Sequence, residues 1–350
     1  MYFCKEMKDS AEELLERRTL PDEGLRDLLE GCDASQTERL HRYALETSRE
    51  SFHGQVYLRA LIEWSNVCRN DCLYCGIRRS NGSVRRYTLS REEILSSCQA
   101  AYGDGLRTFV LQGGENPAAT GFIAGTVAEI KASWPDCAVT LSLGELTYAD
   151  YAQLRKSGAD RYLLRHETAD PVHYSTLHPA GMKLSSRLAC LEELRRLGFQ
   201  TGMGMMVGSP RQTVECLIAD LRLMERLRPQ MIGAGPFIPH HETPFRDYPS
   251  GSAELTLRLY SILRLMFPKA LIPSTTALST VMEGGRTAGI LAGANVIMPN
   301  YTPSHRRGDY TLYEGKDAPR IESKENLGRL EVELAAVGWS ISSSRGDYEE

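Results

Sequence analysis

The stretch VYLRALIEWSNVCRNDCLYCG, residues 56–76, joins an apolar segment to three closely spaced cysteines. Cys68, Cys72 and Cys75 are separated by three and then two residues, a spacing that can hold three irons of a cubane [4Fe–4S] cluster. The fourth iron has no local protein ligand, so it is open to a substrate or cofactor. The spacing therefore predicts one cluster that takes part in chemistry.

Zinc binding and disulfide formation are two other uses of closely spaced cysteines. A structural zinc site normally closes with four ligands, and no second pair of Cys or His has matching spacing, since His53 lies well upstream and Cys98 falls in an expected helix. Disulfides are unusual in a cytosolic chain, where crowded thiolates more often bind metal. A zinc-binding domain and a non-catalytic Fe–S scaffold remain as alternatives to an enzyme. The Cys-x3-Cys-x-aromatic-Cys pattern itself resembles the signature of the radical S-adenosylmethionine (SAM) superfamily.

The composition is that of an ordinary soluble protein. The 350 residues are 42% hydrophobic and 25% charged, with a net charge of −4, so no broad basic surface for nucleic acid is expected. We find no apolar run long enough for a membrane span and no signal-peptide pattern. Scattered single cysteines indicate a reduced compartment, so we predict a cytoplasmic protein. These cysteines are Cys4, Cys32, Cys98, Cys137, Cys190 and Cys216.

The chain alternates short apolar segments with longer amphipathic ones after a helical start. Apolar residues recur at three and four over residues 8–52, the period of a helix. Eight strands are then expected, and helices fill most of the intervals between them. Eight alternations predict an α/β fold with a parallel sheet closed as a (β/α)8 TIM barrel, with an open doubly wound sheet as the competitor. The expected strands are 56–62, 107–111, 138–143, 161–165, 201–207, 230–235, 271–276 and 294–298.

These elements divide the chain into three parts. We predict a helical extension at 1–54, the barrel at 55–310 and a C-terminal tail packing on the barrel at 311–350. A barrel of this kind needs roughly 250 residues, which the middle part supplies.

Polar residues collect where the expected strands end, and in such barrels chemistry lies at the carboxyl ends of strands. Gly114 follows the second strand and permits close backbone approach to a ligand, so Glu115 or nearby carbonyls could hold the SAM ammonium, although a plain turn is the alternative. Glu167 suits a ribose diol, while Arg165 and Arg187 suit a carboxylate. For each of these three, a structural role is about as plausible.

A histidine pair and a group of arginines are two further features of the sequence. His240 and His241 are adjacent in an extended loop, where side chains point in different directions, so a second metal there is not expected. Three alternative roles are open for the arginines Arg78, Arg79, Arg85 and Arg86. They could form only a solvated loop, hold an anionic substrate or attract an acidic electron donor.

The strand-end motifs together resemble the HydE family of [FeFe]-hydrogenase maturases, in the biotin synthase-like branch of radical SAM enzymes. The resemblance covers roughly residues 8–316. The cysteine motif alone indicates only radical SAM chemistry, whereas RHET and NVIMPN are more specific. The stretches that carry it are 65–79, 139–145, ADRYLLRHET at 159–168, GPFIPH at 235–240 and GANVIMPN at 293–300.

The resemblance implies roles for individual residues. Cys68, Cys72 and Cys75 would bind the cluster. The SAM side of the cavity would be lined by Gln112, Arg165, Glu167, Arg187 and Met206. The substrate would face Arg59, Thr140, Ser142, Thr275, Thr276, Met298 and Tyr310.

The resemblance also implies an activity and partners. SAM would be cleaved reductively to a 5′-deoxyadenosyl radical that attacks the cysteine sulfur of an iron–cysteine complex carrying CO and cyanide. Partner hydrogenase maturases would supply this small organometallic substrate, and a low-potential donor of ferredoxin or flavodoxin type would supply electrons. No cysteine follows Cys216, so the accessory cluster of some members is not expected and neither is sulfur donation. A methylornithine synthase-like mutase is the alternative enzyme, and the tail after Lys316 matches weakly.

Overall fold

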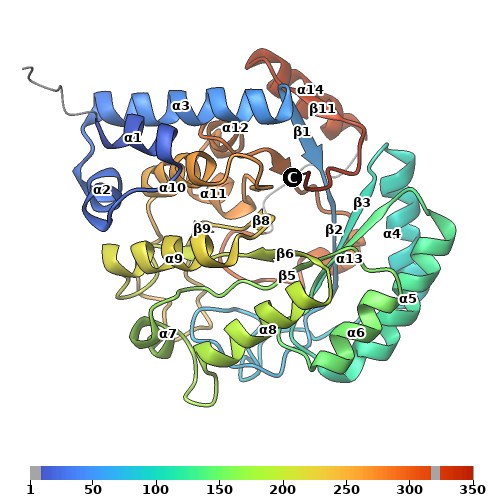
Figure 1. The fold of residues 1–350 in the computed structure, drawn as a ribbon. Coiled ribbons are helices and arrows are strands. Elements are labelled where there is room, and N and C mark those ends of the chain that lie inside the picture. Colours follow the sequence, from blue (N-terminus) through green and yellow to red (C-terminus); the bar gives the residue numbers. More distant parts are fainter. Residues whose placement is uncertain (1–8, 317–323, 350) are drawn as a thin grey trace, which may run out of the picture.

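A run of helices precedes the sheet, as the apolar periodicity predicts. The computed structural model describes residues 9–316 and 324–349. It begins with α1 (Ser10–Arg17), α2 (Asp22–Arg26), a π-helical turn over Asp27–Gly31 and α3 (Ala34–Phe52). Asp33 caps α3 through a reciprocal capping box with Gln36. The apolar side of α3 packs on α10 (Ala253–Met266), so these helices cover one side of the molecule (Figure 1).

A closed ring of parallel strands forms the centre of the molecule. Six strands pair in the order β2-β3-β4-β5-β6-β8, and β1 pairs with β10. Backbone bridges from Met231 to Leu271 and from Pro273 to Val296 join the two sheets. The ring is therefore complete, which confirms the TIM barrel and excludes the open sheet. The strands are β1 (Gln55–Leu58), β2 (Ala60–Ser65), β3 (Thr108–Gly113), β4 (Ala138–Ser142), β5 (Arg161–Leu163), β6 (Gln200–Met203), β8 (Met231–Ile232) and β10 (Val296–Ile297).

Several expected strands are shorter than predicted or divided. The first is interrupted at Arg59, and two others continue after a break as β7 (Met206–Val207) and β9 (Gly235–Pro236), which pair with each other. The expected strand 271–276 forms only the two bridges. It contains Pro273, which has no N–H to donate to a neighbouring strand, and Thr276 already begins α11 (Thr276–Val281).

Helices surround the ring on its outside (Figure 1). Those of the barrel repeat begin with side-chain caps at several positions, including Ser90 before α4 and Thr147 before α6. The helices after α3 are α4 (Arg91–Gly103), α5 (Thr120–Ser133), α6 (Tyr148–Lys156), α7 (Pro171–Leu177), α8 (Leu184–Arg196), α9 (Val214–Leu227), α12 (Gly285–Leu291), α13 (Ser304–Arg307) and α14 (Lys324–Ala336), besides α10 and α11.

A short C-terminal strand, β11 (Ser340–Ser342), was not expected from the sequence. It runs parallel to β1, with Gln55 opposite Ser340 and Tyr57 opposite Ser342. β3 pairs with the chain only from Ala60 onward, so it does not reach β1. β11 therefore covers an edge of β1 that would otherwise lack a neighbouring strand.

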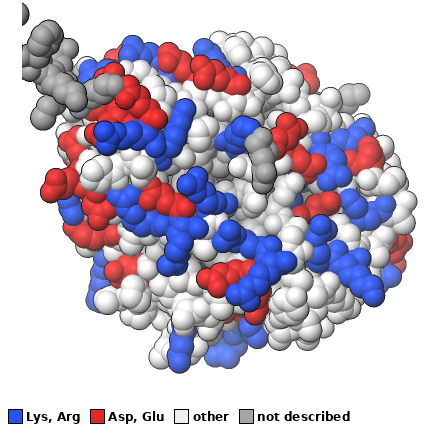
Figure 2. All heavy atoms as spheres, viewed as in Figure 1, with Lys and Arg blue, Asp and Glu red and all other residues white. Residues whose placement is uncertain are grey.

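The described part of the chain contains no helix with the length and apolar character needed to cross a bilayer. On the face seen in Figure 2, basic and acidic side chains are intermixed.

Candidate active site

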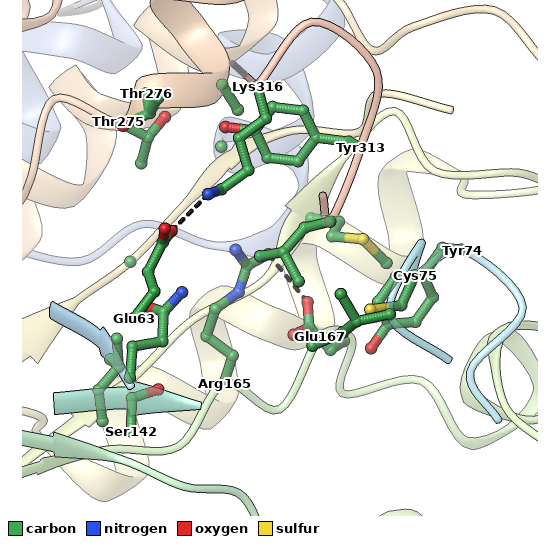
Figure 3. A pocket seen from close by; sticks show the side chains of 18 of the residues that line it. Glu63, Tyr74, Cys75, Ser142, Arg165, Glu167, Thr275, Thr276, Tyr313 and Lys316 are labelled. Carbon is green, nitrogen blue, oxygen red and sulfur yellow. Dashed lines mark hydrogen bonds and ion pairs between the residues drawn. The ribbon is translucent and has the colours of Figure 1, made fainter. Parts of the chain in front are cut away.

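The carboxyl ends of the strands surround a cavity of about 360 Å³. It brings together residues that lie far apart in the sequence, from the cysteine loop to the segment after β10 (Figure 3). Most of the predicted site residues lie in its wall. They are Cys68, Cys75, Gln112, Gly114, Glu115, Ser142, Arg165, Glu167, Arg187, Met206, Thr275, Thr276, Met298 and Tyr310.

The cysteine loop follows β2 and is held in place by its own side chains. Arg86 donates to the carbonyls of Asn66, Ile77, Arg78 and Asn81. Arg78 bonds Asp71 at 2.7 Å, and this ion pair holds the pKa of Asp71 well below its usual value. Arg78 and Arg86 therefore stabilise the loop, whereas the side chains of Arg79 and Arg85 are directed to solvent.

Burial controls the chemistry of the three thiols. Cys72 is 9% exposed, and burial raises the pKa of its thiol to about 12. Burial likewise raises the pKa of Cys68 and of Cys75. The Glu115 backbone N–H donates to the Cys68 sulfur at 3.3 Å. Buried thiols with few nearby cations need a bound cation to become thiolates, so this donor set fits an iron–sulfur cluster.

The Gly113–Glu115 turn at the end of β3 lies directly against the cysteine loop. A Cβ on Gly114 would come within 2.4 Å of the Val67 carbonyl oxygen, so only glycine fits. The carboxylate of Glu115 bonds Arg69 at 2.8 Å and accepts from the Glu145 backbone at 2.7 Å. Glu115 thus ties three loops together. Both carboxylate oxygens of Glu115 therefore already have a partner within the protein.

The Arg165–Thr168 segment presents two charged groups to the cavity. Arg165 bonds Glu167 at 2.8 Å, and Glu167 has a left-handed backbone with a φ of 67°. Arg187 enters from α8 and bonds Glu145 at 2.9 Å. Positive and negative groups therefore alternate along this wall, an arrangement suited to a zwitterionic amino acid and a ribose diol.

The rest of the cavity wall carries one amide, several hydroxyls and one thioether. Gln112 donates to the Tyr310 hydroxyl at 3.4 Å, and Thr275 caps α11 while bonding Tyr260. Ser142 at the end of β4 and Met298 after β10 also line the cavity.

Three predicted residues lie outside the cavity lining. Cys72 belongs to the same loop as Cys68 and Cys75 but is buried. Thr140 is two residues before Ser142 on β4, one layer deeper, and its hydroxyl has no hydrogen-bond partner in the described structure. Arg59 donates to the Met231 sulfur and the Gly346 carbonyl, next to the C-terminal segment.

The two adjacent histidines do not point apart as expected. Their rings stack with centroids 4.4 Å apart and 20° between planes, and His241 bonds Glu314 at 2.7 Å. Ligand atoms of His240, His241 and Glu314 lie within 4.8 Å of one another. The nitrogen lone pairs of parallel rings run alongside each other and do not converge on one ion, so the geometry is poor for a metal.

One ion pair in the cavity wall, between Glu63 and Lys316, is not predicted by the sequence (Figure 3). Glu63 lies inside an apolar run and Lys316 is 253 residues away, so no local pattern connects them.

Comparisons with known proteins point to one family. The profile of the Radical SAM superfamily matches residues 62–224. The [FeFe] hydrogenase maturase subunit HydE of Thermotoga maritima is 45% identical over 305 residues, covering 87% of each chain. A 3-methylornithine synthase of Methanosarcina acetivorans is 29% identical over 82% of this chain and 81% of its own.

Solved structures agree on the fold. The crystal structure of methylornithine synthase superposes with a TM-score of 0.82 at 26% identity, covering 95% of this chain and 97% of that one. The structure of HydG, a maturase of the [FeFe]-hydrogenase, superposes with a TM-score of 0.79 at 21% identity, covering 97% and 77%. Together with the cysteine loop and the barrel, these similarities mean that the chain is a radical SAM enzyme and belongs to the family of the [FeFe]-hydrogenase maturase subunit HydE.

Proposed function

We propose that this enzyme reductively cleaves SAM at an open [4Fe–4S] cluster and acts on an iron–cysteine complex carrying CO and cyanide, in assembly of the [FeFe]-hydrogenase active site. The observation that carries the proposal is a cavity with the cysteine loop at one end and polar groups at the other, in a chain 45% identical to a HydE subunit. When bound, the cluster supplies the electron that cleaves a C–S bond of SAM and so yields the 5′-deoxyadenosyl radical.

The residues of the chain have the remaining tasks. Cys68, Cys72 and Cys75 hold the cluster, and no other protein ligand is assigned to it. Arg165 and Arg187 bind the SAM carboxylate, Glu167 accepts from its ribose hydroxyls, and Met206 packs beside them. Gln112 donates to the Tyr310 hydroxyl and so orients it between the SAM side and the substrate side of the cavity.

The remaining lining residues position the substrate and keep water out. Tyr310 is 2% exposed and is fixed by Gln112, so its ring closes this side. Ser142, Thr275 and Thr276 offer hydroxyls, and Met298 offers an apolar surface. Excluding water matters because a radical formed here must react only with the substrate.

The proposed setting is the cytoplasm, with partner hydrogenase maturases that deliver the substrate and receive the product. The exposed Arg79 and Arg85 flank the cysteine loop and suit an acidic, low-potential donor of ferredoxin or flavodoxin type.

The test is product analysis under reducing, anaerobic conditions. Reconstituted enzyme with SAM, dithionite and the partner maturase's iron complex is expected to consume the complex and release 5′-deoxyadenosine or an adenosylated product. Unchanged SAM in the presence of a verified cluster would contradict the proposal.

The second candidate is a mutase like methylornithine synthase, favoured by the TM-score of 0.82 and 26% identity to that structure. Lysine incubated with reduced enzyme and SAM separates the two: a rearranged amino acid supports the mutase, and unchanged lysine supports the maturase.

A further inference from the structure

The deep end of the cavity carries a buried ion pair that none of the roles above uses. Glu63 on β2 is fully buried and the Lys316 side chain is 8% exposed. Glu63 pairs in register with Gln112, so it faces the barrel interior next to a cavity residue. Asn300 donates to the second carboxylate oxygen at 3.1 Å. In Figure 3 the pair lies across the cavity from Cys75, with Arg165 and Glu167 between them.

The pair also lines a second cavity, of about 450 Å³. Glu63, Ser274, Thr276, Met298 and Lys316 line both. A buried ion pair contributes little net stability, because desolvation offsets most of the attraction. Its position in a cavity wall points to a ligand.

Both groups have hydrogen-bonding capacity left. An ammonium has three N–H donors, and within the described residues Lys316 has one acceptor, Glu63, and lies 4.8 Å from the centre of the Tyr310 ring. A carboxylate has about four acceptor sites, and the described donors to Glu63 are Lys316 and Asn300. Each member therefore has hydrogen-bonding capacity that no described residue fills.

The charge balance selects the ligand. A lone anion next to Lys316 would also lie beside the Glu63 carboxylate, and a lone cation would lie beside the Lys316 ammonium. An α-amino acid avoids both penalties, since its ammonium and carboxylate are attached to one carbon and match two protein charges in direct contact. Binding then adds no net charge to a buried site.

We propose that Glu63 and Lys316 form a clamp for the amino-acid end of the substrate, with Glu63 accepting from its amine and Lys316 donating to its carboxylate. This deepens the proposed function and rests on it, since the substrate proposed there contains a cysteine. The amino-acid side chain is directed from the clamp toward the middle of the cavity.

The test uses probes that each lack one charged group. S-methyl-L-cysteine carries both groups, 2-(methylthio)ethylamine lacks the carboxylate and 3-(methylthio)propionate lacks the amine. Their thioether sulfur also avoids the strong iron binding of a free thiol. Binding is measured by anaerobic calorimetry on reconstituted enzyme with SAM bound. Wild type is expected to bind the amino acid about tenfold or more tighter than either fragment, as one charged hydrogen bond is worth at least this factor.

The variants assign each group to its partner. Lys316→Met is expected to weaken the propionate probe but to leave the amine probe bound as tightly or more tightly, because the like charge beside it is gone. Glu63→Gln is expected to do the opposite. Lys269→Met and Glu50→Gln, both at exposed positions, serve as matched charge controls that leave all three affinities unchanged.

The proposal is overturned if wild type binds the three probes equally, or shows no saturable binding of S-methyl-L-cysteine up to about 10 mM. It is also overturned if each variant weakens all probes to the same extent, because a purely structural role of the ion pair predicts that result. The wild-type result decides even where a variant does not fold. Release of 5′-deoxyadenosine by the same wild-type preparation tests the proposed function separately.

Discussion

His166 shows how one buried residue positions two cavity residues without reaching the cavity itself. It lies between Arg165 and Glu167, is fully buried, and bonds Asp220 of α9 at 2.9 Å. Its other ring nitrogen accepts from the Gly204 backbone at 3.3 Å. The histidine thus fixes the segment against both a helix and the neighbouring strand, which keeps Glu167 in its left-handed conformation.

Replacing Asp220 tests this arrangement. Asp220→Ala leaves the His166 ring and the Ala169 N–H without an acceptor in the core. We expect a loss of about 3 kcal/mol in the free energy of unfolding, because each buried unsatisfied group costs about 1–3 kcal/mol. Urea unfolding measures this loss, and SAM affinity should also fall because Arg165 and Glu167 are held less firmly. Asp247→Ala, at a position whose side chain is 88% exposed, is the control. Equal stability of the two variants would refute the positioning role.

The cluster cysteines give a second prediction at this scale. Cys72→Ala removes the most buried of the three thiols, and two thiolates cannot retain a cubane. Iron content and the EPR signal of the reduced protein are expected to disappear, together with SAM cleavage. Cys32→Ala, in the N-terminal helical region, should retain all three properties. Retained turnover in Cys72→Ala would show that the cluster is held elsewhere.

At the scale of elements, the end of β3 must approach the cysteine loop closely. Gly114→Ala would place a methyl group 2.4 Å from the Val67 carbonyl oxygen and 2.8 Å from the Cys68 Cβ. Overpacking of this kind costs about 1–3 kcal/mol and here displaces a cluster ligand. We therefore expect lower iron occupancy after reconstitution as well as a lower melting temperature.

The matched control for this prediction is Gly121→Ala in α5. A Cβ there meets no atom within 4 Å, and alanine favours helix over glycine. It should melt at the same or a higher temperature with full iron. If Gly114→Ala also reconstitutes fully, the close approach is not needed for the cluster.

Element by element, the sequence predicts what depends on local pattern. Strand-end residues such as Gln112, Arg165 and Glu167 could be picked out because each lies at the end of an apolar run, and in the structure they line one cavity. Arg59 lies at the break between β1 and β2, within the first expected strand. The direction of its side chain therefore depends on where this break occurs. Glu63 and Lys316 meet only through closure of the whole barrel, which no short window of sequence contains.

At the scale of the whole molecule, the C-terminal segment closes the barrel end opposite the cysteine loop. After β11, the Arg345 carbonyl accepts from both Thr108 and Arg161. Asp347 forms an ion pair with Arg161, whose side chain is fully buried. The segment therefore fills space between strands with polar groups that accept hydrogen bonds from two buried arginines, Arg59 and Arg161.

Removing the Asp347 carboxylate tests how strongly this closure supports the fold. Although burial alone would raise it, Arg161 and Arg345 hold the pKa of Asp347 below its usual value. A lowered folded-state pKa stabilises the protein above the unfolded pKa of about 3.9 and loses that effect as the pH falls toward the folded value. Asp347→Ala should therefore cost about 2 kcal/mol at pH 7, less than a fully buried pair because Asp347 is 34% exposed.

The pH dependence distinguishes charge from packing. The free energies of unfolding of wild type and Asp347→Ala, measured in urea, should differ most at pH 7. This difference should narrow below about pH 3.9. Asp347→Asn, which keeps a hydrogen-bond acceptor for Arg161 but no charge, should fall between them at pH 7. A gap that stays constant with pH would mean that the segment holds the barrel closed by packing alone. In that case the Asp347 carboxylate would have no part in holding the buried arginines.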